Sequence, residues 1–151
     1  MLNNISIEGA KIIFRNFSGE PGKFNAKGVR SFCVLLDADL ADQLSADGWN
    51  VKVLRPIDSD DEPQPYLQVS VKYDVKPPRV VVITSKKKTL LDEDTVGSLD
   101  WAEIQNVDLI ITPYEWEVNG KHGVKAYLKS LYVTIVEDEF EEKYRDLDGD
   151  F

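Results

Sequence analysis

Residues 108–136 constrain the fold most strongly, because they predict two long paired strands. Apolar and polar residues alternate along 108–117 and again along 121–136. Between these runs lies Asn119-Gly120, a pair favoured in tight β-hairpin turns, although a turn extended through residue 123 also fits. The parity of the apolar residues changes by one position near Ser130. Such a change requires a β-bulge, which coils a strand as a barrel needs.

Further strands are predicted elsewhere in the chain, at residues 1–17, 29–36, 49–56, 66–73 and 80–84. The first of these is expected to be one long strand that bends or bulges at Gly9. The run 66–73 alternates most clearly, with Leu67, Val69 and Val71 directed toward the core and the residues between them directed outward.

One helix is predicted over residues 37–48. Asp37 or Asp39 can cap its start, and Gly48 is a typical helix stop. Residues 89–106 are ambiguous, because a short helix could begin there. Within that stretch, Trp101 is expected to pack against the core.

These elements predict a mostly β protein with seven strands and one short helix. There is no alternation of strands and helices of the kind that builds a parallel sheet, so an antiparallel barrel or sandwich is expected. A small Greek-key barrel with one helix between strands is an OB-fold, which is the fold we predict. The 151-residue chain is long enough for one domain, which we place at residues 1–136.

The remaining residues, 137–151, form a predicted acidic, flexible tail that ends in the aromatic Phe151. The tail holds eight acidic and two basic side chains, a net charge of −6, whereas the whole chain carries −9. The body is therefore close to charge balance, and its negative total does not exclude a local surface that binds a polyanion.

Several classes of function lack support in the sequence. The single Cys33 and the single His122 exclude a Cys/His zinc site, and no nucleophile or phosphate-loop motif is present. No cofactor is therefore expected, and the protein is predicted not to be an enzyme. No apolar run is long enough to span a membrane, and no signal peptide is recognisable, so a cytosolic protein without membrane contact is expected.

Basic residues interleaved with aromatic residues point to a binding function instead. Lys125, Tyr127 and Lys129 share one strand face, and Tyr114 and Trp116 share a face of the neighbouring strand. Single-stranded nucleic acid is bound by this combination, because cations follow the phosphates and rings stack on bases of any sequence. A solvated sheet surface would show similar alternation.

The order of motifs resembles that of bacteriophage single-stranded DNA-binding proteins, the helix-destabilising proteins of phage replication. The matching stretches are Phe24-Asn25 with Gly28, Arg30 and Phe32, then Gly48-Trp49-Asn50, 66–73, 108–116 and 123–134 with its YLKSLYVT. The terminal Asp148-Gly149-Asp150-Phe151 is similar to the acidic, aromatic-ended tails of phage and bacterial proteins of this kind.

The resemblance implies an OB-fold and DNA binding without sequence preference, in phage DNA replication and recombination. It also implies a tail that recruits phage DNA polymerase, helicase–primase or recombination proteins in the cytoplasm of the infected bacterium. The tail residues assigned to partner binding are Asp146, Asp148, Asp150 and Phe151. A cationic groove and an anionic tail on one chain can also bind each other, so the tail is expected to compete with DNA.

The candidate DNA-binding residues fall into two groups. Stacking on bases is assigned to Phe24, Tyr66, Tyr114, Trp116 and Tyr127. Phosphate contact is assigned to Arg15, Lys23, Arg30, Lys52, Lys72, Lys86, Lys87, Lys88, Lys125 and Lys129.

Two other readings remain open at this level. The chain could be a β-sandwich scaffold or virion component that binds a protein partner through its tail, without affinity for nucleic acid. A nuclease is a third possibility, and it would require a carboxylate cluster in the groove. Homodimerisation is plausible in the resembling family.

Overall fold

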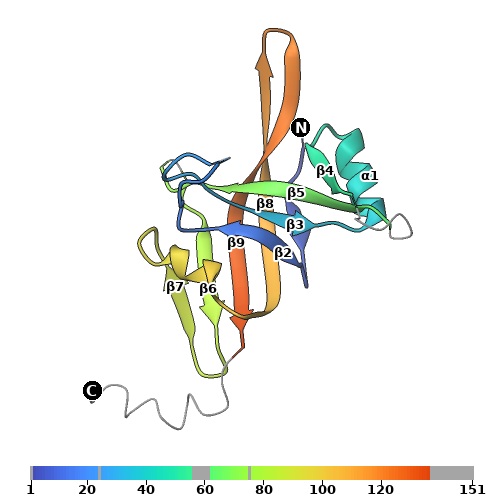
Figure 1. The fold of residues 1–151 in the computed structure, drawn as a ribbon. Coiled ribbons are helices and arrows are strands. Elements are labelled where there is room, and N and C mark those ends of the chain that lie inside the picture. Colours follow the sequence, from blue (N-terminus) through green and yellow to red (C-terminus); the bar gives the residue numbers. More distant parts are fainter. Residues whose placement is uncertain (1, 24, 56–61, 75, 137–151) are drawn as a thin grey trace, which may run out of the picture.

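The computed structural model describes residues 2–23, 25–55, 62–74 and 76–136. Phe24 and the tail, residues 137–151, lie outside the described residues, so the predictions made for them are not addressed by the structure. Within the described part, the chain is mostly β, with one short α-helix and one 3-10 helix (Figure 1). This confirms the predicted fold class at the level of a mostly β protein with one short helix.

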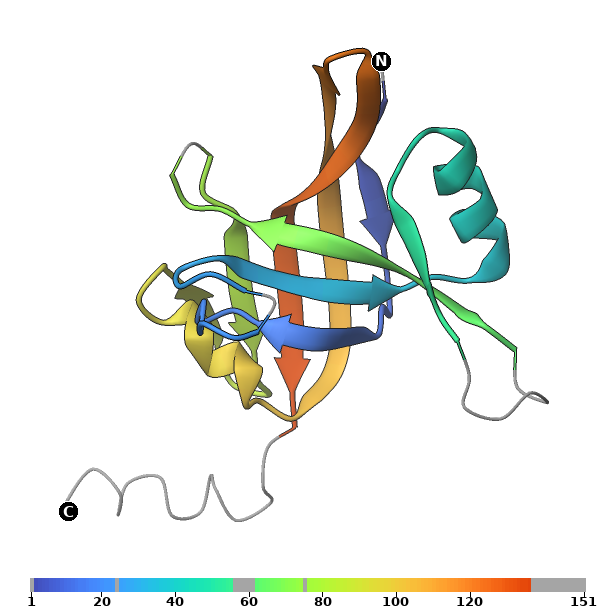
Figure 2. The ribbon, with the colours of Figure 1, turned by 45° about the horizontal axis from the view of Figure 1, so that its top comes forward.

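The elements follow one another as β1 (Ile5–Ile7), β2 (Ile12–Asn16), β3 (Arg30–Leu35), α1 (Ala38–Ala46), β4 (Val51–Leu54), β5 (Gln64–Val71), β6 (Arg79–Ile83), β7 (Lys88–Leu91), η1 (Val96–Asp100), β8 (Ile104–Val118) and β9 (Lys121–Ile135). The strand order along the sheet is β1-β8-β9-β5-β3-β2, with β4 attached to β5 and β6 placed between β7 and β9. Strands β2, β3 and β5 cross in front of β8 and β9 (Figure 2).

The N-terminal segment forms two strands where the sequence predicts one. The break falls at Gly9, where a bend or bulge was predicted. Its φ of +62° is a conformation that glycine adopts without strain. Its backbone N–H donates to the Asp108 carboxylate at 2.9 Å. Strand β1 then pairs with β8, whereas β2 pairs with β3. One short segment therefore contributes to both ends of the sheet path.

The helix forms where the sequence predicts it. The Asp37 carboxylate accepts a hydrogen bond from the Leu40 backbone N–H at 2.7 Å, so Asp37 is the N-cap, one of the two candidates that the sequence left open. Ala41 and Leu44 are buried against the sheet, and Gly48 follows the helix with a φ of +96°. The helix therefore covers the core beside β4 rather than standing free.

Strands β8 and β9 form the predicted hairpin, which Figure 1 shows extending beyond the body of the sheet. Asn119 and Gly120 make the turn, both with positive φ, as a tight two-residue turn requires. Ile110 pairs with Ser130 and Ile111 with Leu128, so Lys129 is the extra residue of a bulge. The prediction of a bulge next to Ser130 is confirmed.

The core lies between the crossing strands. The predicted inward residues of β5, Leu67, Val69 and Val71, are all buried. Phe17 and Phe32 stack at a centroid distance of 5.1 Å and have no exposed surface. Because Leu67, Val69 and Val71 are buried, the residues between them on β5 are directed to the outer face.

The prediction that Trp101 packs in the core is wrong. Its side chain is 89% exposed, because it follows η1 on the outside of the turn while Val96 and Leu99 fill the core. The sequence also missed β7, which starts within the lysine run at Lys88 and pairs with β6. No helix among the described residues is long and apolar enough to cross a membrane.

Candidate nucleic-acid interface

The ring of Tyr127 is the centre of a cluster on the outer face of the sheet. The ammonium groups of Lys125 and Lys72 lie 5.5 and 5.7 Å from its centroid, and the Tyr114 ring lies edge-on to it at 5.8 Å. We call these four residues the Tyr127 cluster. Two cations and two rings, from β8, β9 and the residue after β5, thus meet at one point, an arrangement that can stack a base and contact a phosphate.

Strand register explains how the cluster forms. Tyr114 pairs directly with Lys125, and Thr112 pairs with Tyr127, so these side chains share one face of the hairpin. Lys72 directly follows β5, whose Ser70 pairs with Tyr127 in the parallel contact between β5 and β9. The sequence prediction that Tyr114 lies near Tyr127 is therefore confirmed by the geometry.

Trp116 extends the same face toward the tip of the hairpin. It pairs with Gly123, and a Cβ atom built at Gly123 would lie only 2.8 Å from the Trp116 ring. The indole therefore lies over bare backbone, and its position depends on the absence of a side chain at Gly123. Trp116 is 39% exposed and Tyr114 is 56% exposed, so both rings are accessible.

A second aromatic pair lies farther along β5. The rings of Tyr66 and Phe14 meet edge-on at 6.1 Å, and Lys52 is the cross-strand partner of Tyr66. Phe14 is 60% exposed and has a positive φ of 52°, unusual for a residue other than glycine. Phe14 was not among the residues predicted from the sequence, because it lies in an apolar stretch with Ile12 and Ile13.

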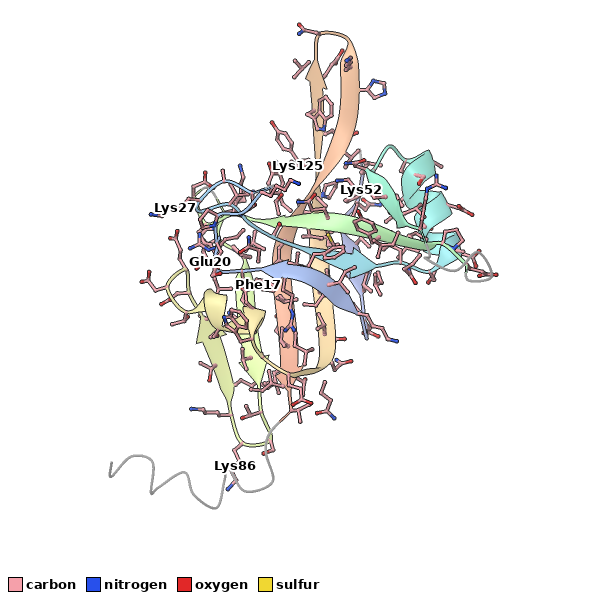
Figure 3. The ribbon with its side chains drawn as sticks, viewed as in Figure 1. Phe17, Glu20, Lys27, Lys52, Lys86 and Lys125 are labelled. Atoms are coloured by element: carbon pink, nitrogen blue, oxygen red, sulfur yellow. The ribbon has the colours of Figure 1, made fainter. Side chains whose placement is uncertain are left out.

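The two groups share one surface. Tyr66, Gln68 and Ser70 alternate outward along β5, and Lys72 follows the strand, so this row runs from the second aromatic pair to the Tyr127 cluster. We call this surface the β5–β9 face. It comprises Phe14, Lys52, Tyr66, Lys72, Tyr114, Trp116, Lys125 and Tyr127. Figure 3 shows Lys52 and Lys125 toward the hairpin end of the molecule.

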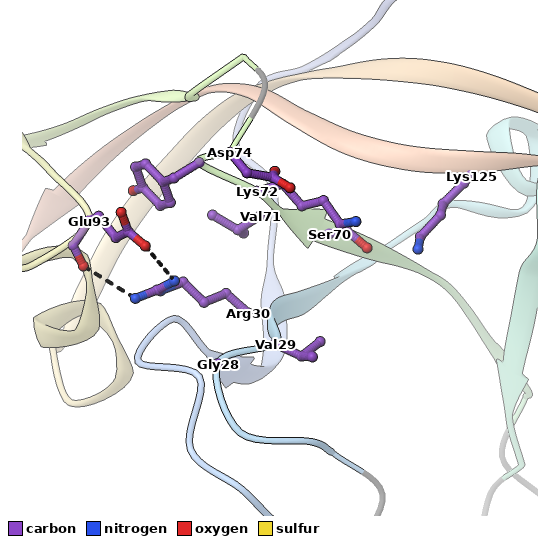
Figure 4. A pocket seen from close by; sticks show the side chains of 10 residues that line it. Gly28, Val29, Arg30, Ser70, Val71, Lys72, Asp74, Glu93 and Lys125 are labelled. Atoms are coloured by element: carbon purple, nitrogen blue, oxygen red, sulfur yellow. Dashed lines mark hydrogen bonds and ion pairs between the residues drawn. The ribbon is translucent and has the colours of Figure 1, made fainter.

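A cavity of about 300 Å³ adjoins this face (Figure 4). Arg30, Tyr73 and Glu93 line it together with Lys72 and Lys125 of the Tyr127 cluster. Burial raises the pKa of the Tyr73 hydroxyl, and the nearby Arg30 charge opposes that rise by a smaller amount. The predicted phosphate ligand Arg30 is therefore close to the Tyr127 cluster.

Burial also affects a titratable group next to the β5–β9 face. It raises the pKa of the Cys33 thiol, and the nearby Lys52 ammonium lowers that pKa by a smaller amount. The buried Cys33 therefore lies close to the Lys52 charge, and the two strands that hold these residues, β3 and β4, both pair with β5.

Other predicted residues lie apart from the β5–β9 face. The Arg15 guanidinium donates to the backbone carbonyls of Leu99 and Ala102 at 2.9 and 2.8 Å, so it connects β2 to η1 and to the segment that follows η1. Lys86 lies at the end of the molecule opposite the hairpin tip, well away from Lys125 (Figure 3).

Four further candidates have other positions. Lys87 belongs with Lys86 to the turn between β6 and β7, and Lys88 begins β7. Lys23 lies in the loop between β2 and β3, and the bulged Lys129 is exposed two residues beyond Tyr127. The lysine run at 86–88 therefore does not join the β5–β9 face.

The metal-binding capacity of the described residues is small. Within residues 2–23, 25–55, 62–74 and 76–136, no group of three or more His, Cys, Asp or Glu side chains is placed to hold a metal ion.

Solved structures with the same fold include two of the single-stranded DNA-binding protein from bacteriophage Enc34. The C-terminally truncated form matches with a TM-score of 0.56 and 11% identity, covering 89% of this chain and 87% of that one. The same protein in complex with ssDNA matches with a TM-score of 0.53 and 13% identity, covering 91% and 89%. These likenesses show a shared fold.

A search among curated proteins finds no match. The family model described as the phage ssDNA-binding domain matches residues 1–149, almost the full length. The chain therefore belongs to the phage single-stranded DNA-binding domain family.

Proposed function

We propose that the protein binds single-stranded DNA, without sequence preference, along the β5–β9 face. The observation that carries this proposal is the Tyr127 ring with Lys72 and Lys125 beside it and Tyr114 at its edge. A ring accepts any base by stacking, whereas the flanking ammonium groups attract the phosphates on either side. In accord with its family, the protein acts by binding rather than by catalysis.

Charge on the hairpin supports a path on one of its two sides. Glu115 and Glu117 alternate with Tyr114 and Trp116 along β8, so they are directed to the opposite face. Their carboxylates repel phosphates from that face. The bound DNA strand therefore passes over the aromatic side of the hairpin and continues along β5 toward Tyr66.

Duplex recognition has less support from the described residues. Reading a duplex requires a helix or ribbon that fits a groove and carries cations to the phosphates. The α-helix α1 is capped by Asp37 and carries Asp39 and Asp42, so its exposed surface is acidic. We therefore expect a preference for single strands.

The domain boundary and the tail carry the finer parts of the proposed function. We propose an OB-fold domain at 1–136 and a tail at 137–151 that competes with DNA for the β5–β9 face. The tail's net charge of −6 supports competition, and its terminal Phe151 supports recruitment of phage replication or recombination proteins. These steps would occur in the cytoplasm of the infected bacterium.

Fluorescence titration with oligo-dT at two salt concentrations tests the function. We expect saturable binding that weakens as salt rises, and much weaker binding to a duplex of the same length. A chain ending at Val136 should bind more tightly, most clearly at low salt. If neither the full chain nor this shorter chain binds oligo-dT, the proposed function is wrong.

A further inference from the structure

The cavity beside the Tyr127 cluster has the chemistry of an anion site. It lies between the start of β3, the end of β5 and the segment after β7 (Figure 4). Three cations line it, Arg30, Lys72 and Lys125, together with the carboxylates of Asp74 and Glu93. Lys72 and Lys125 also contact the Tyr127 ring, so the cavity opens onto the place where we propose that a base stacks.

Arg30 is the most deeply placed cation of this cavity. Its guanidinium lies over the Tyr73 ring, 5.6 Å from the centroid, and its side chain is 19% exposed. The Nη1 atom contacts the Glu93 carboxylate at 3.4 Å, and Nη2 donates to the Glu93 backbone carbonyl at 3.5 Å. Both distances exceed the roughly 2.7–2.9 Å of strong charge-assisted hydrogen bonds.

The hydrogen bonding of this site is incomplete within the described residues. The Nε atom of Arg30 and the hydroxyl of Tyr73 are both buried, and neither has a hydrogen-bond partner there. A guanidinium offers five N–H donors in a fork that matches a phosphate. Arg30 thus retains hydrogen-bond donors that Glu93 does not use. The Glu93 side chain is 59% exposed, so it can move away from Arg30 easily.

We propose that this cavity is a phosphate subsite for the bound strand, and that Glu93 is its internal competitor. In the absence of DNA, the Glu93 carboxylate forms an ion pair with the Arg30 guanidinium. When a base stacks on Tyr127, a neighbouring phosphate enters between Arg30, Lys72 and Lys125 and displaces Glu93. This inference rests on the proposed function, because it assigns one phosphate of the same bound strand.

The variant Glu93→Gln gives the first test. It removes the competing charge and keeps the size of the side chain, so it should tighten oligo-dT binding by about two- to five-fold at low salt, the range of a partly exposed ion pair. Asp94→Asn is the matched control: Asp94 is the next residue, is exposed, and does not line the cavity. It removes the same charge and should change affinity less.

The variant Arg30→Gln tests whether Glu93 acts through Arg30. It should weaken binding and reduce the slope of log affinity against log salt by roughly 0.7, the value for one phosphate contact to a single strand. In the Arg30→Gln background, Glu93→Gln should then have no further effect. Thermal melting of each variant establishes that it is folded.

The outcomes separate this inference from the proposed function. If wild-type protein binds oligo-dT but Glu93→Gln and Asp94→Asn tighten binding equally, Glu93 is not a competitor and the inference is overturned. The same conclusion follows if Glu93→Gln tightens binding to the same extent without Arg30. If neither the wild-type protein nor the chain ending at Val136 binds oligo-dT, the proposed function itself fails.

Discussion

Replacement of Tyr127 by leucine tests the stacking role of the Tyr127 cluster. Leucine keeps an apolar side chain on β9 but removes the ring that Lys72, Lys125 and Tyr114 surround. Base–aromatic stacking contributes about 1–3 kcal/mol per base. At 1.4 kcal/mol per tenfold change, the dissociation constant for oligo-dT should rise by about 5- to 150-fold.

The salt dependence distinguishes a lost ring from a lost charge. Tyr127→Leu removes no cation, so the plot of log affinity against log salt should shift down and keep its slope. Lys125→Gln removes one cation near the same ring, and the slope should decrease by roughly 0.7. Fluorescence anisotropy of a labelled oligo-dT, measured at four or more salt concentrations, gives both quantities.

Trp101→Leu provides the control for loss of an aromatic side chain. Trp101 has the most exposed of the large hydrophobic side chains among the described residues, and it lies outside the β5–β9 face. Its replacement should leave both affinity and slope unchanged. The stacking argument is refuted if Tyr127→Leu binds like wild type while it remains folded, or if Trp101→Leu weakens binding to the same extent.

Three further predictions follow from single contacts or segments. Gly123→Ala places a Cβ atom 2.8 Å from the Trp116 ring, so it should displace the indole, shift the tryptophan fluorescence and weaken oligo-dT binding. Arg15→Gln removes the charged hydrogen bonds to two carbonyls and should lower the free energy of unfolding in urea by about 1.5–3 kcal/mol, with no change in the salt slope of binding. Burial raises the pKa of the Cys33 thiol, so the folded state holds this proton more strongly than the unfolded chain does. The free energy of unfolding should therefore fall as pH rises above the ordinary thiol pKa. Cys33→Ala should remove that part of the pH dependence.

Each of these predictions has an outcome that contradicts it. An unchanged tryptophan spectrum in Gly123→Ala would show that Trp116 does not depend on the missing side chain. A change of salt slope in Arg15→Gln would indicate a direct phosphate contact. A pH dependence of unfolding that is unaltered in Cys33→Ala would show that the thiol is not the group that titrates.

The parts of the fold that were predictable are those set by local chemistry. The Asn119-Gly120 turn, the bulge beside Ser130 and the Asp37 cap each depend on residues close together in the chain. Alternation along β5 likewise determined which side chains are buried. Such features follow from backbone conformation and side-chain period, which a sequence displays directly.

The parts that were missed depend on contacts between distant segments. In the sequence, Arg15 looks like a surface cation. In the structure its guanidinium donates hydrogen bonds to backbone carbonyls 84 and 87 positions away in the chain. Phe14 is exposed because β2 is irregular between Ile13 and Asn16, where the register against β3 shifts. Neither the carbonyl positions nor this register shift can be read from the local pattern.

The candidate site shows the same division. Register along the hairpin placed Tyr114 near Tyr127, as expected from the sequence. The approach of Lys72 depends on the parallel contact between β5 and β9, which joins strands far apart in the chain. The sequence therefore indicated the residue types of the site, whereas the topology selects which of them meet.

Photocrosslinking tests most directly whether DNA lies on the β5–β9 face. The full chain is irradiated with an oligonucleotide that contains 5-iododeoxyuridine, and the crosslinked residues are identified by mass spectrometry. We predict crosslinks at Tyr127, Trp116 and Tyr66, and none at Trp101. Efficient crosslinking that is confined to Trp101 or to other residues outside the face would contradict the central claim.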